Sequence, residues 1–102
     1  MSIELYSKKM VHIVVSTSME HQLKKTIRAS GACGFTYYTV KGEGESGPQT
    51  GHLAGDSSTL FMVTTHAEQC ETLLEKLKAL KERGHHLTVF VSDTQVLNPT
   101  KF

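Results

Sequence analysis

Two strand-helix units, each with a polar helix start, constrain the fold of this chain more than any other feature. Residues 10–16 (MVHIVVS) form an apolar run rich in β-branched residues, which predicts a strand, and residues 58–64 (STLFMVT) predict another. A capping-box pattern follows each, at 17–20 (TSME) and at 65–68 (THAE). Each unit is therefore expected to continue from a strand directly into a helix.

Apolar residues recur at helical spacing after both capping patterns. In the first unit they are Met19, Leu23 and Ile27, and in the second they are Cys70, Leu73, Leu74, Leu77 and Leu80. One apolar stripe on each helix is typical of a helix that packs against a sheet. Gly31 and Gly84 follow the two stripes and predict the helix ends.

Two more strands complete the predicted order. Residues 34–41 (GFTYYTVK) are aromatic and β-branched, and residues 87–92 (LTVFVS) alternate in the same way, with 93–97 as an extension or a short fifth strand. The order β-α-β-β-α-β predicts an α+β fold, a ferredoxin-like sandwich with an antiparallel sheet and both helices on one face. Residues 1–102 are expected to form a single domain.

The strand patterns predict apolar side chains on both faces of the sheet. Val11, Ile13 and Val15 occupy one face of the first strand, but Met10 and Val14 make the other face apolar too. Two helices on one side cannot cover both faces, and monomers seldom expose such a patch. Self-association is therefore expected.

Charge, hydropathy and cysteine content limit the function classes. The chain carries 11 basic and 10 acidic residues, which argues against a general nucleic-acid binder. The N-terminus has no signal-peptide pattern, and no run approaches the roughly 20 apolar residues of a membrane span. A cytoplasmic protein without membrane insertion is expected, with Cys33 and Cys70 as reduced thiols and a disulfide between them as the minor alternative.

The segment 42–57 (GEGESGPQTGHLAGDS) is much longer than an ordinary hairpin loop. Its glycine content favours a flexible recognition arm that becomes ordered on a ligand or partner. An insertion without a role is the alternative.

Arg83, His85 and His86 surround a glycine before the last predicted strand and favour a local anion-binding corner. The alternative is an ordinary helix end with exposed imidazoles. A histidine pair alone is a weak metal signal. Because no catalytic motif or carboxylate pair is recognisable, no catalytic residue and no metal ligand is predicted, and His12 is interpreted as a core or interface histidine.

Three stretches resemble the signalling proteins of the nitrogen regulatory PII superfamily. The first, residues 31–36 (GACGFT) together with 40–44 (VKGEG), resembles the end of the first helix, the second strand and the base of the family's T-loop. The second, residues 83–86 (RGHH), lies at the place of its B-loop, and the third is the ending 91–97 (VSDTQVL). The last stretch is most similar to the PII-like proteins associated with bicarbonate transporters and carboxysomes.

The resemblance implies a homotrimer that binds adenine nucleotides in clefts between subunits. Thr36 and its neighbours would face the adenine, Gly42 and Gly44 would allow a close approach of the backbone, and the 83–86 turn would face the phosphates. The implied ligand-binding residues are Gly34, Phe35, Thr36, Lys41, Gly42, Gly44, Arg83, Gly84, His85 and His86. Glu43 and Glu45 depart from the basic or amide residues of classical members and disfavour highly charged ligands.

The expected function is therefore a non-enzymatic sensor of a small anionic metabolite. AMP, ADP, ATP, cyclic AMP and bicarbonate are the candidate ligands, with no permanent cofactor, and a transporter or an enzyme is the expected partner. A metal-responsive trimer of the divalent-cation-tolerance type and a small ferredoxin-like enzyme are the alternatives.

Overall fold

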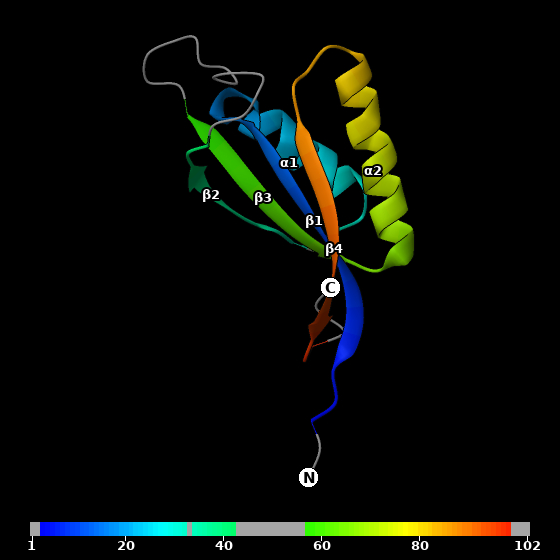
Figure 1. Ribbon diagram of the computed structural model, residues 1–102. Helices are drawn as coiled ribbons and strands as arrows, with labels where there is room; N and C mark the ends of the chain where they lie inside the picture. Colours follow the sequence, from blue (N-terminus) through cyan, green and yellow to red (C-terminus); the bar gives the residue numbers. More distant parts are fainter. Residues whose placement is uncertain (1–2, 33, 43–56, 99–102) are drawn as a thin grey trace.

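The computed structural model describes residues 3–32, 34–42 and 57–98. In chain order its elements are β1 (Tyr6–Ser16), the 3-10 helix η1 (Thr17–Met19), α1 (Glu20–Ala29), β2 (Thr36–Val40), β3 (Ser58–Thr65), α2 (Ala67–Glu82) and β4 (Thr88–Val96). The strands form one antiparallel sheet in the order β2-β3-β1-β4. Both helices lie on the same side of this sheet (Figure 1). The predicted fold class is confirmed.

The core lies between the sheet and the two helices. Val11, Ile13 and Phe61 are fully buried on the helix-facing side of the sheet. From the helices, the predicted stripes supply the buried residues Leu23, Ile27, Cys70, Leu73, Leu77 and Leu80, while Met19 and Leu74 pack at the edge of this core. Cys70 is a buried free thiol, as expected for a small apolar side chain, and Cys33 lies outside the described residues.

Helix α2 starts one residue later than the capping pattern predicts. The imidazole Nδ1 of His66 accepts the hydrogen bond from the Gln69 backbone N–H at 3.3 Å, so His66 is the N-cap. Thr65 cannot serve because it is the last residue of β3, where its hydroxyl is buried and donates to the Lys9 carbonyl at 3.3 Å.

The first predicted capping box is also wrong. Ser16 caps η1, because its hydroxyl accepts from the Ser18 N–H at 3.3 Å. The Glu20 carboxylate accepts a hydrogen bond from the hydroxyl of Thr59 on β3 at 2.6 Å instead of returning to the helix start. A partner distant in sequence thus replaces the local one.

Strands β1 and β4 are longer than the predicted runs. β1 begins at Tyr6 and pairs with β4 from Tyr6↔Val96 to Val14↔Thr88, whereas its pairing with β3 begins only at Lys9. The two strands therefore continue past the rest of the sheet as a two-stranded ribbon, at the lower end in Figure 1. Residues 93–96 extend the fourth strand and do not form a fifth.

Candidate functional site

The turn that carries Arg83, His85 and His86 is a well-defined helix end. Gly84 has a φ of +100°, a conformation that glycine adopts without the steric cost of a side chain. Its N–H donates to the Lys81 carbonyl at 3.0 Å, and the His85 N–H donates to the Leu80 carbonyl at 3.2 Å. This pair of bonds is a Schellman motif, so the turn has a fixed backbone and presents exposed Arg83 and His86 side chains.

The remaining candidate residues belong to β2 and its two flanks. Gly34 and Phe35 precede the strand, Thr36 is its first residue, and Lys41 and Gly42 follow its last. Thr36 and Gly42 therefore lie at opposite ends of β2. Gly44 lies outside the described residues.

Phe35 contributes to packing as well. Its ring centroid lies 5.8 Å from that of buried Phe61, and the Arg28 guanidinium lies 5.5 Å from its centroid. A Cβ at Gly34 or Gly42, by contrast, would meet no atom within 4 Å. Nothing inside the described part of the chain therefore requires glycine at these two positions, and their close approach to a ligand stays a prediction.

The two groups of candidate residues lie on opposite edges of the sheet. β2 is one edge strand and β4, which follows the 83–86 turn, is the other. Val40 pairs with Ser58, which pairs with Ser16, while Thr88 pairs with Val14, so the end of β2 and the start of β4 lie at the same end of the sheet. Three strand spacings separate the two edges, about 14 Å. One chain does not bring the two groups together.

A chain of hydroxyl groups lies between the two edges at this end. The Thr17 hydroxyl lies 2.8 Å from that of Ser57 and 3.1 Å from that of Thr59, and the Thr59 hydroxyl donates to Glu20 at 2.6 Å. Because the Thr59 hydroxyl donates its hydrogen bond to the carboxylate, Thr17 donates to Thr59 and Ser57 donates to Thr17. The Thr17 N–H also donates to the Ser57 carbonyl at 2.8 Å. These bonds hold the root of the segment that precedes β3 against the start of α1.

No helix of the described chain covers the sheet side away from α1 and α2 (Figure 1), and several apolar side chains lie on that side. We call this surface the open face; by strand register and pleat, its members include Met10, His12, Val14, Tyr38, Leu60, Met62 and Phe90. His12 stacks on Phe90 with centroids 4.4 Å apart and an interplanar angle of 4°, and its Nε2 lies 3.2 Å from the Ser92 hydroxyl. Phe90 and Tyr38 remain 50% and 49% exposed.

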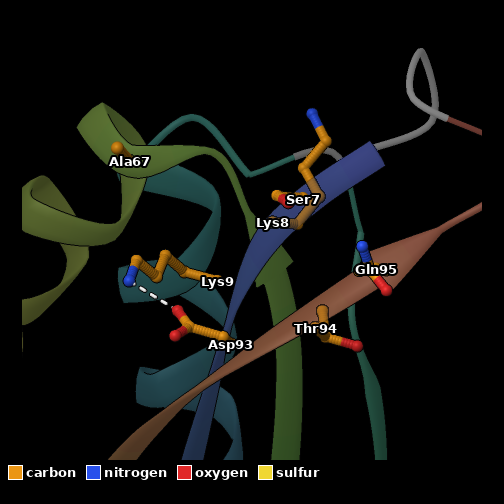
Figure 2. Close-up of a pocket in the computed structure, with 7 residues that line it drawn as sticks. All are labelled: Ser7, Lys8, Lys9, Ala67, Asp93, Thr94 and Gln95. Atoms are coloured by element: carbon orange, nitrogen blue, oxygen red, sulfur yellow. Dashed lines mark hydrogen bonds and ion pairs between the residues drawn. The ribbon is translucent and has the colours of Figure 1, made fainter. Parts of the chain in front are cut away.

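A pocket that the sequence did not indicate lies beside the two-stranded ribbon (Figure 2). Lys9 Nζ lies 2.6 Å from a carboxylate oxygen of Asp93 across the strand pair, next to Ala67 at the start of α2. The hydrogen bond to Asp93 and the charge of its carboxylate raise the pKa of Lys9. The register that pairs these two residues is a long-range property, so the sequence contained no local signal for the pocket.

Within residues 3–32, 34–42 and 57–98, no group of three or more His, Cys, Asp and Glu residues is placed to hold a metal ion. In the same ranges, neither helix has the length and apolarity to cross a bilayer.

One known protein family matches nearly the whole chain. The sequence profile described as Nitrogen regulatory protein P-II matches residues 8–101. The chain belongs to the P-II family. The expected family is confirmed, while a search of curated proteins finds no significant match.

Solved structures of P-II-like proteins share this fold over their whole length. CPII from Thiomonas intermedia K12, bound to ADP and bicarbonate, is 29% identical with a TM-score of 0.86, and 99% of each chain is covered. A CPII structure with ADP, AMP and bicarbonate is 26% identical with a TM-score of 0.84, covering 99% of this chain and 98% of CPII. A Thermus thermophilus protein described as PII-like shares the fold at 22% identity, with a TM-score of 0.80 over 98% of this chain and 99% of that protein. The names of these relatives describe regulatory or signalling proteins.

Proposed function

We propose that this P-II family member is a cytoplasmic regulatory protein that senses an adenine nucleotide, bicarbonate or both. The ligand binds in clefts between the subunits of a homotrimer, and segment 42–57 transmits the bound state to a partner protein such as a transporter. The observation that carries this proposal is the similarity to CPII bound to ADP and bicarbonate, which extends over 99% of both chains.

The placement of the candidate residues supports a site between subunits. Thr36, Lys41 and Gly42 belong to the β2 edge, and the 83–86 turn belongs to the β4 edge of the same sheet. A small ligand can contact both groups only if the β2 edge of one subunit meets the β4 edge of the next. The open face supplies the apolar surface that such an assembly would bury.

The charges near the candidate site favour a modestly charged anion. Arg83 is exposed and has no ion pair among the described residues, so its guanidinium is available to a phosphate or carboxylate. Glu43 and Glu45, which lie outside the described residues, would oppose a strongly charged ligand placed at the loop base. AMP and cyclic AMP are therefore expected to bind more tightly than ATP.

Calorimetric titration with AMP, cyclic AMP, ADP, ATP and bicarbonate tests this function. At least one of these ligands should bind, and Arg83→Ala should weaken that binding about tenfold to a hundredfold, because a charge-assisted hydrogen bond contributes about 1.5–3 kcal/mol. Lys81→Ala, which removes a nearby exposed charge from α2, is the control and should bind as the wild type does. If none of the five ligands binds, the proposed function is wrong; if Arg83→Ala binds normally, the assignment of Arg83 is wrong.

A further inference from the structure

A groove of about 780 Å³ lies between the outer surfaces of α1 and α2. Lys25 from α1, Lys76 from α2 and Arg83, which follows the last residue of α2, line it, and Glu82 is the one acidic residue among its lining residues. Ala29 and Ala79 contribute exposed apolar surface between these charges, while Leu80 is buried. We call this surface the interhelical groove.

The cations of the interhelical groove form no ion pair with other residues of the described chain. The ion pair found among the described residues joins Lys9 to Asp93, at a distance from this groove, and Lys25, Lys76 and Arg83 have none there. The helix dipole accounts for a basic residue at the end of α2, such as Arg83. It does not account for Lys76, which lies well inside that helix, or for Lys25 in the middle of α1.

We propose that the interhelical groove is a docking surface for an acidic segment of a partner protein. Glutamate or aspartate side chains of that segment would pair with Lys25, Lys76 and Arg83 along the two walls. The two exposed alanines, Ala29 and Ala79, would contact small side chains of the same segment and would let its backbone come close. The chain's net charge of only +1 makes this concentration of cations a local feature.

A nucleic acid fits the interhelical groove less well than an acidic peptide. Proteins that bind duplex DNA by its backbone neutralise about 6–10 phosphates, and this groove offers three cations with a carboxylate among them. The exposed uncharged surface of Ala29 and Ala79 has no counterpart on a phosphate backbone, whereas a peptide has small apolar side chains to place there.

The proposed assembly leaves this surface accessible. Both helices lie on the side of the sheet opposite the open face (Figure 1), so a trimer formed through the open face would direct the interhelical groove outward. Arg83 belongs both to this groove and to the candidate ligand residues, whereas Lys25 and Lys76 belong to the groove alone, so these two lysines separate docking from ligand binding.

The test uses a fluorescein-labelled 12-residue peptide of glutamate and leucine, with a lysine-leucine peptide of the same pattern for comparison. Fluorescence anisotropy measures its binding to the full chain. The variant Lys25→Glu/Lys76→Glu should weaken binding about tenfold or more, because two attractive pairs become repulsive. The control Lys78→Glu/Lys81→Glu has the same change in net charge, but these lysines line a separate groove beside Val89, so binding should change less than about threefold.

Several results would overturn the docking proposal. They are equal weakening by both double variants, equal binding of the lysine-leucine peptide, no binding of the acidic peptide to the wild type, or preferential binding of a labelled duplex oligonucleotide. Circular dichroism verifies that each variant is folded, and Lys25→Gln/Lys76→Gln replaces the charge-reversal variant if it is not. Titration of Lys25→Glu/Lys76→Glu with the nucleotides and bicarbonate should match the wild type, which separates a failure here from a failure of the proposed function.

Discussion

At the scale of single residues, the hydroxyl chain from Ser57 to Glu20 links three elements of the chain. Thr59 is fully buried, and its short bond to the Glu20 carboxylate joins β3 to the first turn of α1. A buried hydroxyl that donates to a charged acceptor is costly to remove, because the half-buried carboxylate then loses a hydrogen-bond partner. The chain of hydroxyls thus fastens the helix start to the sheet.

Replacing Thr59 tests this link. Thr59→Val keeps the side-chain shape and the β-branch, so the loss of the hydroxyl bonds should lower the free energy of unfolding by about 1–3 kcal/mol. Thr39→Val, at an exposed position that pairs with Thr59, should change it by less than about 0.5 kcal/mol. Urea denaturation measures both. Equal stability of Thr59→Val and the wild type would mean that the hydroxyl chain contributes nothing.

At the scale of elements, the two helix ends depend on backbone conformation. Gly31 and Gly84 have φ values of +92° and +100°, and the Schellman bonds at Gly84 set the direction in which the chain enters β4. A Cβ at Gly84 would meet no neighbouring atom within 4 Å. The cost of replacing this glycine therefore comes from its left-handed backbone conformation and not from a clash with other residues.

Gly84→Ala should therefore lower the free energy of unfolding by about 1–2 kcal/mol, the cost of the left-handed conformation for a residue with a Cβ. Gly34→Ala is the matched control, since Gly34 has no positive φ and a Cβ there meets open space. The control should be neutral or slightly more stable, because alanine restricts the unfolded chain. Thermal and urea denaturation compare the two variants, and a similar loss in both would contradict the explanation.

At the scale of the whole molecule, the open face carries apolar side chains that a single chain leaves exposed to water. Tyr38 and Phe90 are about half exposed in the described chain, and Leu60 lies between Tyr38 and Val14 in the strand register. Burying this apolar surface against other subunits would remove it from water at a gain of about 25 cal/mol per Å². The proposed ligand site between subunits also requires this assembly to bring a β2 edge and a β4 edge from different subunits together.

Light scattering should give a mass near three times the chain mass of 11.3 kDa, which is about 34 kDa. Leu60→Asp should shift the mass toward that of a monomer, because a carboxylate buried without a partner opposes assembly. His21→Asp introduces the same charge on an exposed helix position and should leave the mass unchanged. A wild-type mass of one chain at micromolar concentration would contradict the trimer.

The sequence alone determined which segments form strands and helices and where the helices end. Periodicity, β-branched content and a glycine after an apolar stripe act within a few residues. Residues 10–16, 58–64 and 88–92 therefore lie in strands as predicted, although Leu87 precedes β4, and Gly31 and Gly84 adopt the left-handed conformation expected at helix ends. The short family motifs also pointed to the P-II family, which the match over residues 8–101 confirms.

Only the tertiary structure decided how these elements meet. The capping prediction for Glu20 was wrong because its carboxylate accepts from Thr59, 39 residues away. Lys9 likewise contacts Asp93, 84 residues away, and pairing with that distant strand extends β1 to Tyr6, beyond the predicted run. The same long-range strand order places the β2 and β4 edges apart and leaves His12 and Phe90 stacked on the open face. Strand order and register arise from contacts between segments far apart in the chain, and a local pattern does not contain that information.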